Sequence, residues 1–192
     1  KVIPYGRASD FAADGIRIHF PPLSLYDTLF LKYDVRQSNG RFLSPIHEVH
    51  DESVAIHDLI RLSLRPDTII GSMESKLCLV RITREGQKTY AGGDYNYGFV
   101  SSEVRLFGAY AVGIDSIAPL IKRGFAAGAD LRGHRSVTFT VTDDFSGLKS
   151  YDAYIDGSWA LLEYDAKSNL MIYHPDRNRI KQNSLHQIEI KV

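Results

Sequence analysis

Apolar and polar residues alternate with a period of two along much of this chain, and the pattern predicts strands with almost no helix. In residues 137–142, Val137, Phe139 and Val141 point to one side and three threonines to the other, as in a strand with one face on a core. Comparable runs in the first part of the chain are bounded by glycine, proline and polar turn residues. These runs are residues 16–20, 29–35, 54–64, 76–83, 87–91, 99–107 and 109–114. Short strands at this spacing indicate an all-β sandwich or barrel.

The parity of each run also predicts which side chains face the core. In residues 29–35 the expected inward set is Leu29, Leu31, Tyr33 and Val35. Residues 54–64 form the best core strand of the first half, and Pro66-Asp67 ends it. Its inward set is Val54, Ile56, Ile60, Leu62 and Leu64, and its outward set is His57, Arg61, Ser63 and Arg65.

The run of strands ends at residues 115–119, where a proline interrupts it and a glycine-rich stretch follows. We therefore expect two domains, residues 1–116 and 117–192. The second domain has six candidate strands, which are residues 120–122, 136–142, 149–155, 159–164, 170–173 and 186–192. An immunoglobulin-like sandwich uses about seven strands, and alternation continues to the last residue. The second domain is therefore expected to lack its final strand.

The hairpin at Asp156-Gly157 determines where the single tryptophan points, because a change of one residue in register moves a side chain to the opposite face. If these two residues form the turn, Trp159 pairs with Tyr154 on the face opposite Ile155. If Ser158 joins a three-residue loop, Trp159 lies with Ile155 in the core. We favour the core position.

Composition excludes several functional classes. Lys and Arg number 23, as do Asp and Glu, so the formal net charge is zero and no global field favours nucleic acid or an anionic membrane. No apolar run approaches the length of a membrane span, and no signal-peptide pattern is present, so any export signal is expected upstream. The single cysteine, Cys78, is expected to pack as a small apolar residue. The sequence has no Gly-x-Ser-x-Gly elbow and no phosphate-binding loop.

Aromatic residues supply the weak binding candidates, which are Tyr95, Tyr97 and Trp159. Tyr95, Tyr97 and Phe99 lie on or beside residues 92–98, where glycines let aromatic rings stand out as a sugar or peptide platform requires. Alternatively, these rings fold back and close the end of the sandwich, which is the reading we favour.

One acidic turn raises the question of calcium. Asp143, Asp144 and Ser146 carry oxygens that calcium accepts, but the stretch lacks the ligand count of a known calcium loop. A capped β-turn explains the same residues.

Residues 137–165 contain Asp-Asp-Phe-Ser-Gly, then Ile-Asp-Gly-Ser-Trp, then Glu-Tyr-Asp. This stretch resembles the immunoglobulin-like module that follows the catalytic domain in lysostaphin-type zinc endopeptidases (peptidase family M twenty-three) of Gram-negative gut bacteria, which are cell-wall hydrolases. Residues 14–22, 25–27, 44–50 and 54–58 are similar to the module between peptidase and tail in the same proteins. The resemblance covers nearly the whole chain and implies two consecutive β-sandwich domains without the catalytic domain.

A second resemblance is weaker. The chain has a short strand ending in Phe20-Pro21-Pro22, a second strand, and then Ser44-Pro45 followed by a long apolar strand. This order of features is similar to that of the ZU-type sandwich module of ankyrins and netrin receptors.

The first resemblance specifies what a zinc catalyst would need. Lysostaphin-type enzymes ligate zinc with a His-x-x-x-Asp pair and the second histidine of a later His-x-His. His47 and Asp51 have the first spacing, but none of the seven histidines forms a His-x-His, so the third ligand and the general base have no candidate. Zinc is therefore expected only in the absent catalytic domain. We interpret His47 and His50 as a polar strand end near a loop, and His57 and Asp58 as a solvated face.

By this resemblance the chain is a non-catalytic accessory region of an exported cell-wall metalloendopeptidase, located in the periplasm or cell envelope or outside the cell. Its expected partners are its own catalytic domain and peptidoglycan or another glycan, without nucleic acid, a membrane span or a cofactor of its own. The alternative is a free-standing carbohydrate-binding or adhesion module. An exposed, coplanar arrangement of Tyr95, Tyr97 or Trp159 would distinguish that alternative.

Overall fold

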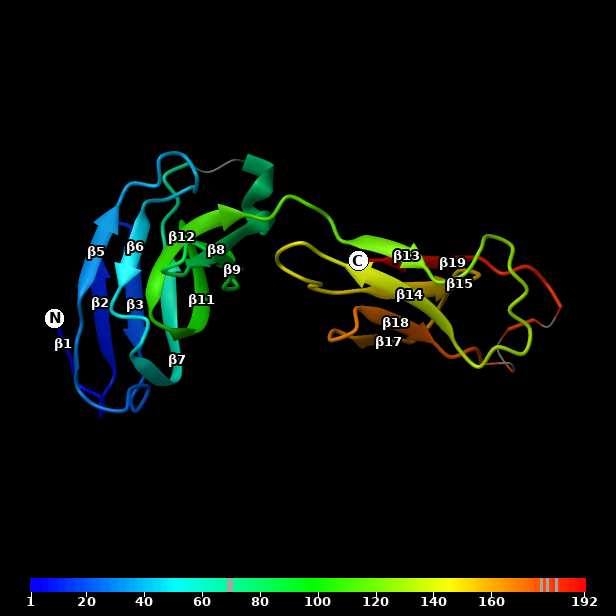
Figure 1. Cartoon of the computed structure of the whole chain (residues 1–192), viewed down its shortest axis with the longest axis horizontal. Coiled ribbons are helices and arrows are strands. Elements are labelled where there is room, and N and C mark those ends of the chain that lie inside the picture. The colour runs from blue at the N-terminus through cyan, green and yellow to red at the C-terminus, as the bar shows by residue number, and fades with distance from the viewer. Residues whose placement is uncertain (69–70, 177, 179, 182) are drawn as a thin grey trace. The chain divides into compact units, whose positions relative to one another are not determined.

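The computed structural model describes residues 1–68, 71–176, 178, 180, 181 and 183–192. The chain divides into two compact units, Lys1–Ser116 and Ile117–Val192 (Figure 1). Each unit has its own hydrophobic core, and its strand pairings are antiparallel among the described residues. Helical structure is limited to the short 3-10 helix η1 (Gly71–Lys76) in these parts of the chain. The structure confirms the all-β sandwich class.

Unit 1 contains the strands of the first 116 residues. They are β1 (Val2–Ile3), β2 (Ser9–Ala13), β3 (Ile16–Phe20), β4 (Leu29–Phe30), β5 (Tyr33–Arg36), β6 (Ile46–Val49), β7 (Ala55–Leu64), β8 (Leu77–Ile82), β9 (Lys88–Tyr90), β10 (Asp94–Asn96), β11 (Phe99–Leu106) and β12 (Gly108–Ile114). Two five-stranded sheets, in the orders β10-β11-β7-β3-β2 and β5-β6-β12-β8-β9, supply the core, and β1 pairs separately with β4.

The central strand β7 faces the core as its parity predicts. Ile56, Ile60, Leu62 and Leu64 are buried, and Val54 is partly buried against the same cluster. Asp58 shares this parity but is exposed. The pairing with β11 shifts register there, from Val104 opposite Ile60 to Leu106 opposite Ala55, so a bulge turns the carboxylate outward.

The expected strand at residues 29–35 is wrong in one respect, because it is two strands. Leu29 and Leu31 are buried, but β4 pairs with β1, whereas β5 pairs with β6 as an edge of the other sheet. Val35 is 48% exposed rather than inward, because its edge strand has no neighbour on one side.

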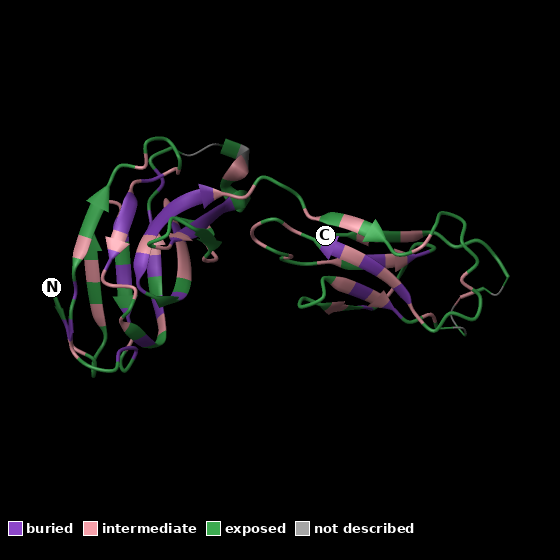
Figure 2. Cartoon of the chain, viewed as in Figure 1, coloured by how far each residue is buried: buried purple, intermediate pink, exposed green. Residues whose placement is uncertain are grey.

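Unit 2 contains the remaining strands. They are β13 (Leu120–Arg123), β14 (Val137–Thr142), β15 (Asp152–Ile155), β16 (Ser158–Trp159), β17 (Leu162–Asp165), β18 (Leu170–Tyr173) and β19 (Ile188–Lys191). They form a sheet in the order β13-β14-β18-β17 and a sheet in the order β16-β15-β19. Phe139, Ala153, Leu162 and Met171 lie in the core that the two sheets share, and Figure 2 shows buried positions along the strands of both units.

The expected strand at residues 159–164 also divides in two, since β16 pairs with β15 and β17 pairs with β18 in the other sheet. Strand β19 lies at the edge of the three-stranded sheet. That a further strand follows β19 stays a prediction. Across the described residues, no helix has the length and apolar character that a bilayer-spanning segment requires.

Candidate functional site

His47 lies on β6 and is buried, at 1% exposure, so its interpretation as a polar strand end is wrong. Its ring is stacked with that of Tyr33 at 6.1 Å between centroids, and its Nδ1 lies 2.8 Å from the Tyr33 hydroxyl. Its Nε2 has no hydrogen-bond partner among the described residues and faces Gly15, where an added Cβ would lie 3.5 Å away. Burial lowers the pKa of His47, so the neutral ring is favoured.

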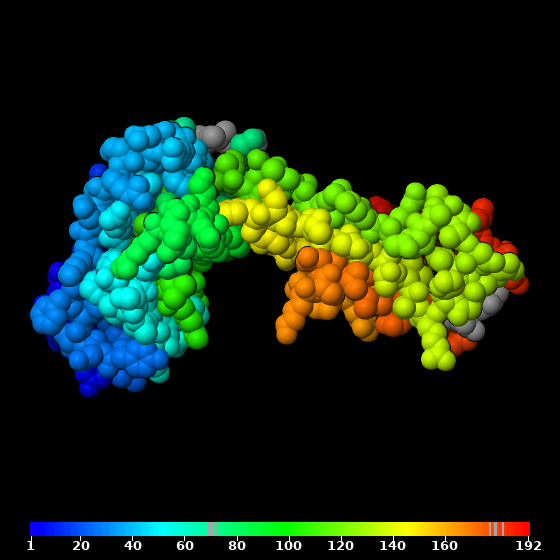
Figure 3. Space-filling model, viewed as in Figure 1, coloured from blue at the N-terminus to red at the C-terminus, as the bar shows by residue number. Residues whose placement is uncertain are grey.

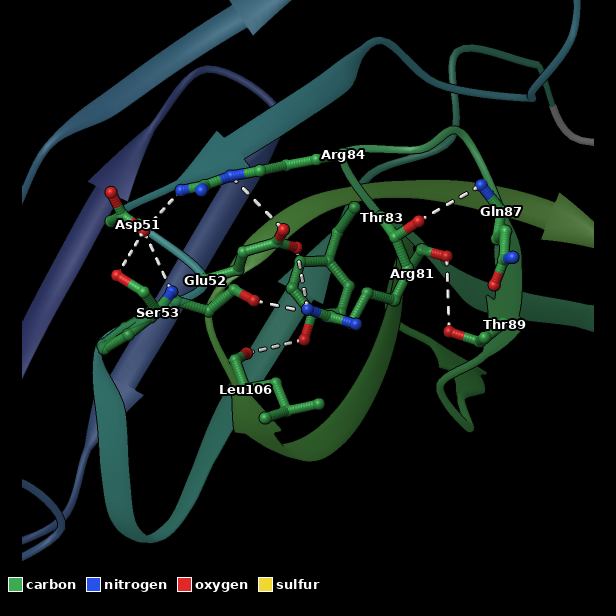
Figure 4. A network of polar contacts seen from close by, with 11 residues as sticks. Asp51, Glu52, Ser53, Arg81, Thr83, Arg84, Gln87, Thr89 and Leu106 are labelled. Carbon is green, nitrogen blue, oxygen red and sulfur yellow. Dashed lines mark hydrogen bonds and ion pairs between the residues drawn. The ribbon is translucent and has the colours of Figure 1, made fainter.

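Asp51, the other half of the His-x-x-x-Asp spacing, has different partners. It accepts hydrogen bonds from the backbone N–H and hydroxyl of Ser53 and from Arg84 at 2.5 Å (Figure 4). The hydrogen bonds from Ser53, assisted by the charge of Arg84, lower the pKa of Asp51. His47 and Asp51 therefore belong to separate hydrogen-bonding groups. No cluster of three or more potential metal ligands occurs among the residues that the structure describes.

The polar network around Asp51 has a structural explanation. Arg81 donates to Glu52 at 3.0 Å and to the carbonyl oxygen of Phe107, and Arg84 contacts Glu52 at 3.3 Å (Figure 4). These contacts join the turn before β7 to β8 and to the connection between β11 and β12. A neighbouring polar groove of about 460 Å³ includes Arg36, whose guanidinium pairs with Glu48 at 2.7 Å. The charges of this region mainly neutralise one another.

The aromatic candidates of unit 1 do not form one platform. Tyr95 packs partly buried against the core, which agrees with rings that close the sandwich. Tyr97, in contrast, is 95% exposed at the tip of the hairpin between β10 and β11. Phe99 lies under the Arg17 guanidinium, 4.1 Å from its carbon to the ring centre.

Trp159 is 55% exposed, so the core position that we favoured is wrong. Ile155 pairs with Ser158 and Tyr154 pairs with Trp159, which leaves a two-residue turn. The turn residues have positive φ angles, 49° at Asp156 and 78° at Gly157, as a tight primed turn requires. Trp159 consequently lies on the face opposite the buried Ile155.

The acidic turn of unit 2 adopts the capped form. One carboxylate oxygen of Asp143 accepts from the backbone N–H groups of Phe145 and Gly147, at 3.1 and 2.7 Å. The capped β-turn that the sequence offered as one explanation is therefore the form that this segment adopts.

The structure also brings together three residues that the sequence did not associate. Ser184 Oγ lies 3.2 Å from His186 Nε2, and His186 Nδ1 lies 2.6 Å from Asp156 Oδ2, the order of contacts in a serine-hydrolase triad. Two further contacts oppose that chemistry. The carbonyl oxygen of Lys181 lies 2.8 Å from Nε2 and accepts a 2.8 Å hydrogen bond from Ser184 Oγ.

A carbonyl oxygen only accepts, so Nε2 donates to Lys181 while Nδ1 donates to the carboxylate of Asp156. The hydrogen bond with Asp156 raises the pKa of His186 accordingly. With Nε2 donating to the Lys181 carbonyl, it does not accept the Ser184 hydroxyl proton in this arrangement. The contacts of His186 with Asp156 and Lys181 link the loop before β19 to the hairpin turn after β15, and we call them the His186 clamp. Ser184 and His186 also border a hollow of about 800 Å³ that residues 123–134 and residues 183–186 help to line. Figure 3 shows these two segments, yellow-green and red, at the same end of unit 2.

Cys78 is buried and its pKa is raised by burial to about 11, so the thiol packs as an apolar group. The geometry thus defines a two-unit β-sandwich protein whose outward features are aromatic side chains and paired charges.

Comparison with known families matches residues 1–115 to the Zu5-like domain, which is more than half of the chain. The chain belongs to the Zu5-like domain family. This match covers unit 1 and agrees with the weaker of the two resemblances in the sequence. A comparison with curated proteins finds no match.

Proposed function

We propose that this chain is the non-catalytic β-sandwich region of an exported cell-wall metalloendopeptidase. In this role it positions the catalytic domain or contacts peptidoglycan, in the periplasm or cell envelope or outside the cell. Zinc belongs to the catalytic domain, and these residues take part in no metal chemistry.

One observation carries the proposal for these residues. The only His-x-x-x-Asp spacing in the sequence has its two side chains engaged separately, His47 in the interior with Tyr33 and Asp51 at the surface with Arg84. A zinc catalyst requires about three converging protein ligands and an open position. The link to a peptidase rests on the sequence resemblance in residues 14–58 and 137–165.

Purified chain incubated with peptidoglycan sacculi, with and without added zinc, tests the first half of the proposal. We expect no turnover in either condition. The proposal would be contradicted by turnover that disappears in Asp51→Asn. Asp34→Asn is a matched control, since it removes a surface carboxylate that does not belong to the His-x-x-x-Asp spacing.

The gene sequence upstream of Lys1 tests the second half. It is expected to encode a signal peptide followed by a domain with the His-x-x-x-Asp and His-x-His motifs. An initiator methionine directly before Lys1 would refute the assignment to a peptidase.

A second candidate function is a free-standing carbohydrate-binding or adhesion module. The exposure of Tyr97 and Trp159 favours it, since large aromatic rings are otherwise preferentially buried. Binding to a glycan by a chain that has no upstream peptidase would distinguish this candidate from the first.

A further inference from the structure

The outer face of the three-stranded sheet β16-β15-β19 in unit 2 carries a short row of side chains. Tyr154 lies directly opposite Trp159 on one side and Glu189 on the other. Ala153 and Ile155, which alternate with Tyr154 along β15, are buried in the core. The row therefore belongs to the outer face of the sheet.

Trp159 and Tyr154 are close neighbours for a geometric reason. Ala160 donates a backbone hydrogen bond to Ala153 at 2.9 Å, so this pair is the hydrogen-bonded one. The adjacent Tyr154–Trp159 pair is then non-hydrogen-bonded, the kind in which side chains approach more closely, with Cβ atoms about 4.5–5.5 Å apart. The exposed Trp159 ring therefore offers an apolar surface beside the half-buried Tyr154.

The charged groups beside the rings are arranged in pairs. The Lys191 ammonium lies 3.2 Å from a carboxylate oxygen of Glu189 and over the Tyr154 ring, 5.1 Å from its centre. Asp152 is opposite Lys191 across the strands. The face thus combines an apolar ring with two carboxylate acceptors, Asp152 and Glu189, and one ammonium donor, Lys191, so its net charge is small. Such a face complements an uncharged, hydroxyl-rich ligand better than a polyanion or a charged peptide.

We infer that this face binds the pyranose rings of an uncharged β-1,4-linked glycan. A β-linked pyranose with equatorial substituents presents flat patches of C–H groups, which can stack on the exposed Trp159 ring. Its hydroxyls donate to Glu189 and Asp152 and accept from Lys191. The inference names the site and ligand class of the second candidate function and rests on that candidate, while remaining compatible with an accessory role beside a peptidase.

Isothermal titration of the full chain with N-acetylglucosamine tetrasaccharide tests the inference, with maltotetraose as the α-linked comparison. We expect saturable binding of the first sugar and weaker or no binding of the second. Trp159→Ala should weaken binding about tenfold or more, as expected for a central aromatic anchor. Glu189→Gln should weaken it several-fold, and Trp159→Phe should retain part of it.

Tyr26→Ala is the matched control, because Tyr26 is an aromatic residue of unit 1 with 68% exposure. It should leave the affinity unchanged. Circular dichroism melting of each variant verifies that unit 2 stays folded. Absence of saturable binding up to millimolar sugar, or equal affinities for wild type and Trp159→Ala, would overturn the inference. Either result would leave the upstream-sequence test of the peptidase proposal unaffected, so the two failures can be told apart.

Discussion

Leu62→Ala tests the core of unit 1 directly. Leu62 is 1% exposed on β7, the middle strand of its sheet, between Ile18 of β3 and Ser102 of β11. The substitution removes three carbon groups, whose transfer from water contributes about 2.4 kcal/mol. A central strand with neighbours on both sides limits collapse around the cavity, so the total loss of unfolding free energy should be roughly 2–5 kcal/mol.

The assay can separate the two units because the only tryptophan, Trp159, lies in unit 2. In urea titrations, tryptophan fluorescence reports unit 2, whereas far-ultraviolet circular dichroism reports both units. Since each unit has its own core, Leu62→Ala should shift the dichroism transition of unit 1 and leave the fluorescence transition in place. Phe139→Ala, in the core of unit 2, should do the opposite with a similar loss of roughly 2–5 kcal/mol.

His57→Ala provides the control on the same strand as Leu62. His57 is exposed, with Nδ1 3.0 Å from the carbonyl oxygen of Leu23 and its ring against Tyr26, so its loss should cost much less than that of Leu62. A Leu62→Ala variant with an unchanged midpoint would refute the assignment of strand faces. A fluorescence transition that moves together with that of unit 1 would refute independent unfolding.

Two histidines should give the units opposite pH dependence. Asp156 raises the pKa of His186 above its ordinary value of 6.5. The His186 clamp therefore stabilises unit 2 below about pH 6.5, and its contribution is lost as the pH rises through the raised pKa. Melting followed by tryptophan fluorescence should show that loss in wild type and not in His186→Gln. Burial lowers the pKa of His47, so the unfolded chain takes up a proton that the folded state resists, and unit 1 should lose stability as the pH falls below 6.5. His47→Gln should reduce that dependence in dichroism melts, with a remainder from His50, whose pKa burial and Lys32 also lower. An unchanged slope would contradict the assignment.

Sequence alternation identified the strands that place one face on a core. Residues 16–20 and 170–173 match β3 and β18, and the inward set of β7 is buried as predicted. Alternation could not identify β2, whose positions are mostly exposed or partly exposed, nor β6, where a histidine and a glutamate interrupt the apolar pattern.

The location of the polar groups depended on contacts distant in sequence. His47 can be buried because the hydroxyl of Tyr33, on the neighbouring strand, hydrogen-bonds its ring, and nothing local in the sequence predicts this. The contact between Asp156 and His186 spans 30 residues and forms only once β15 and β19 pair. Only a knowledge of strand order could have associated these two residues.

The outward position of Trp159 follows from the turn rather than from hydrophobicity, and this has a testable consequence. Positive φ angles at Asp156 and Gly157 allow a two-residue turn, so parity directs Trp159 outward and Ala160 inward, opposite Ala153. The inner pair Ala153 and Ala160 is small, and an indole at either position would overpack the core. Because the exposed ring supports little of the core, Trp159→Ala should change the unfolding free energy of unit 2 by less than about 1 kcal/mol, the scale of one cross-strand pair. Dichroism-detected urea unfolding measures this change. A loss of several kcal/mol would mean that the indole packs in the core of unit 2, which would remove the basis for a glycan-binding face.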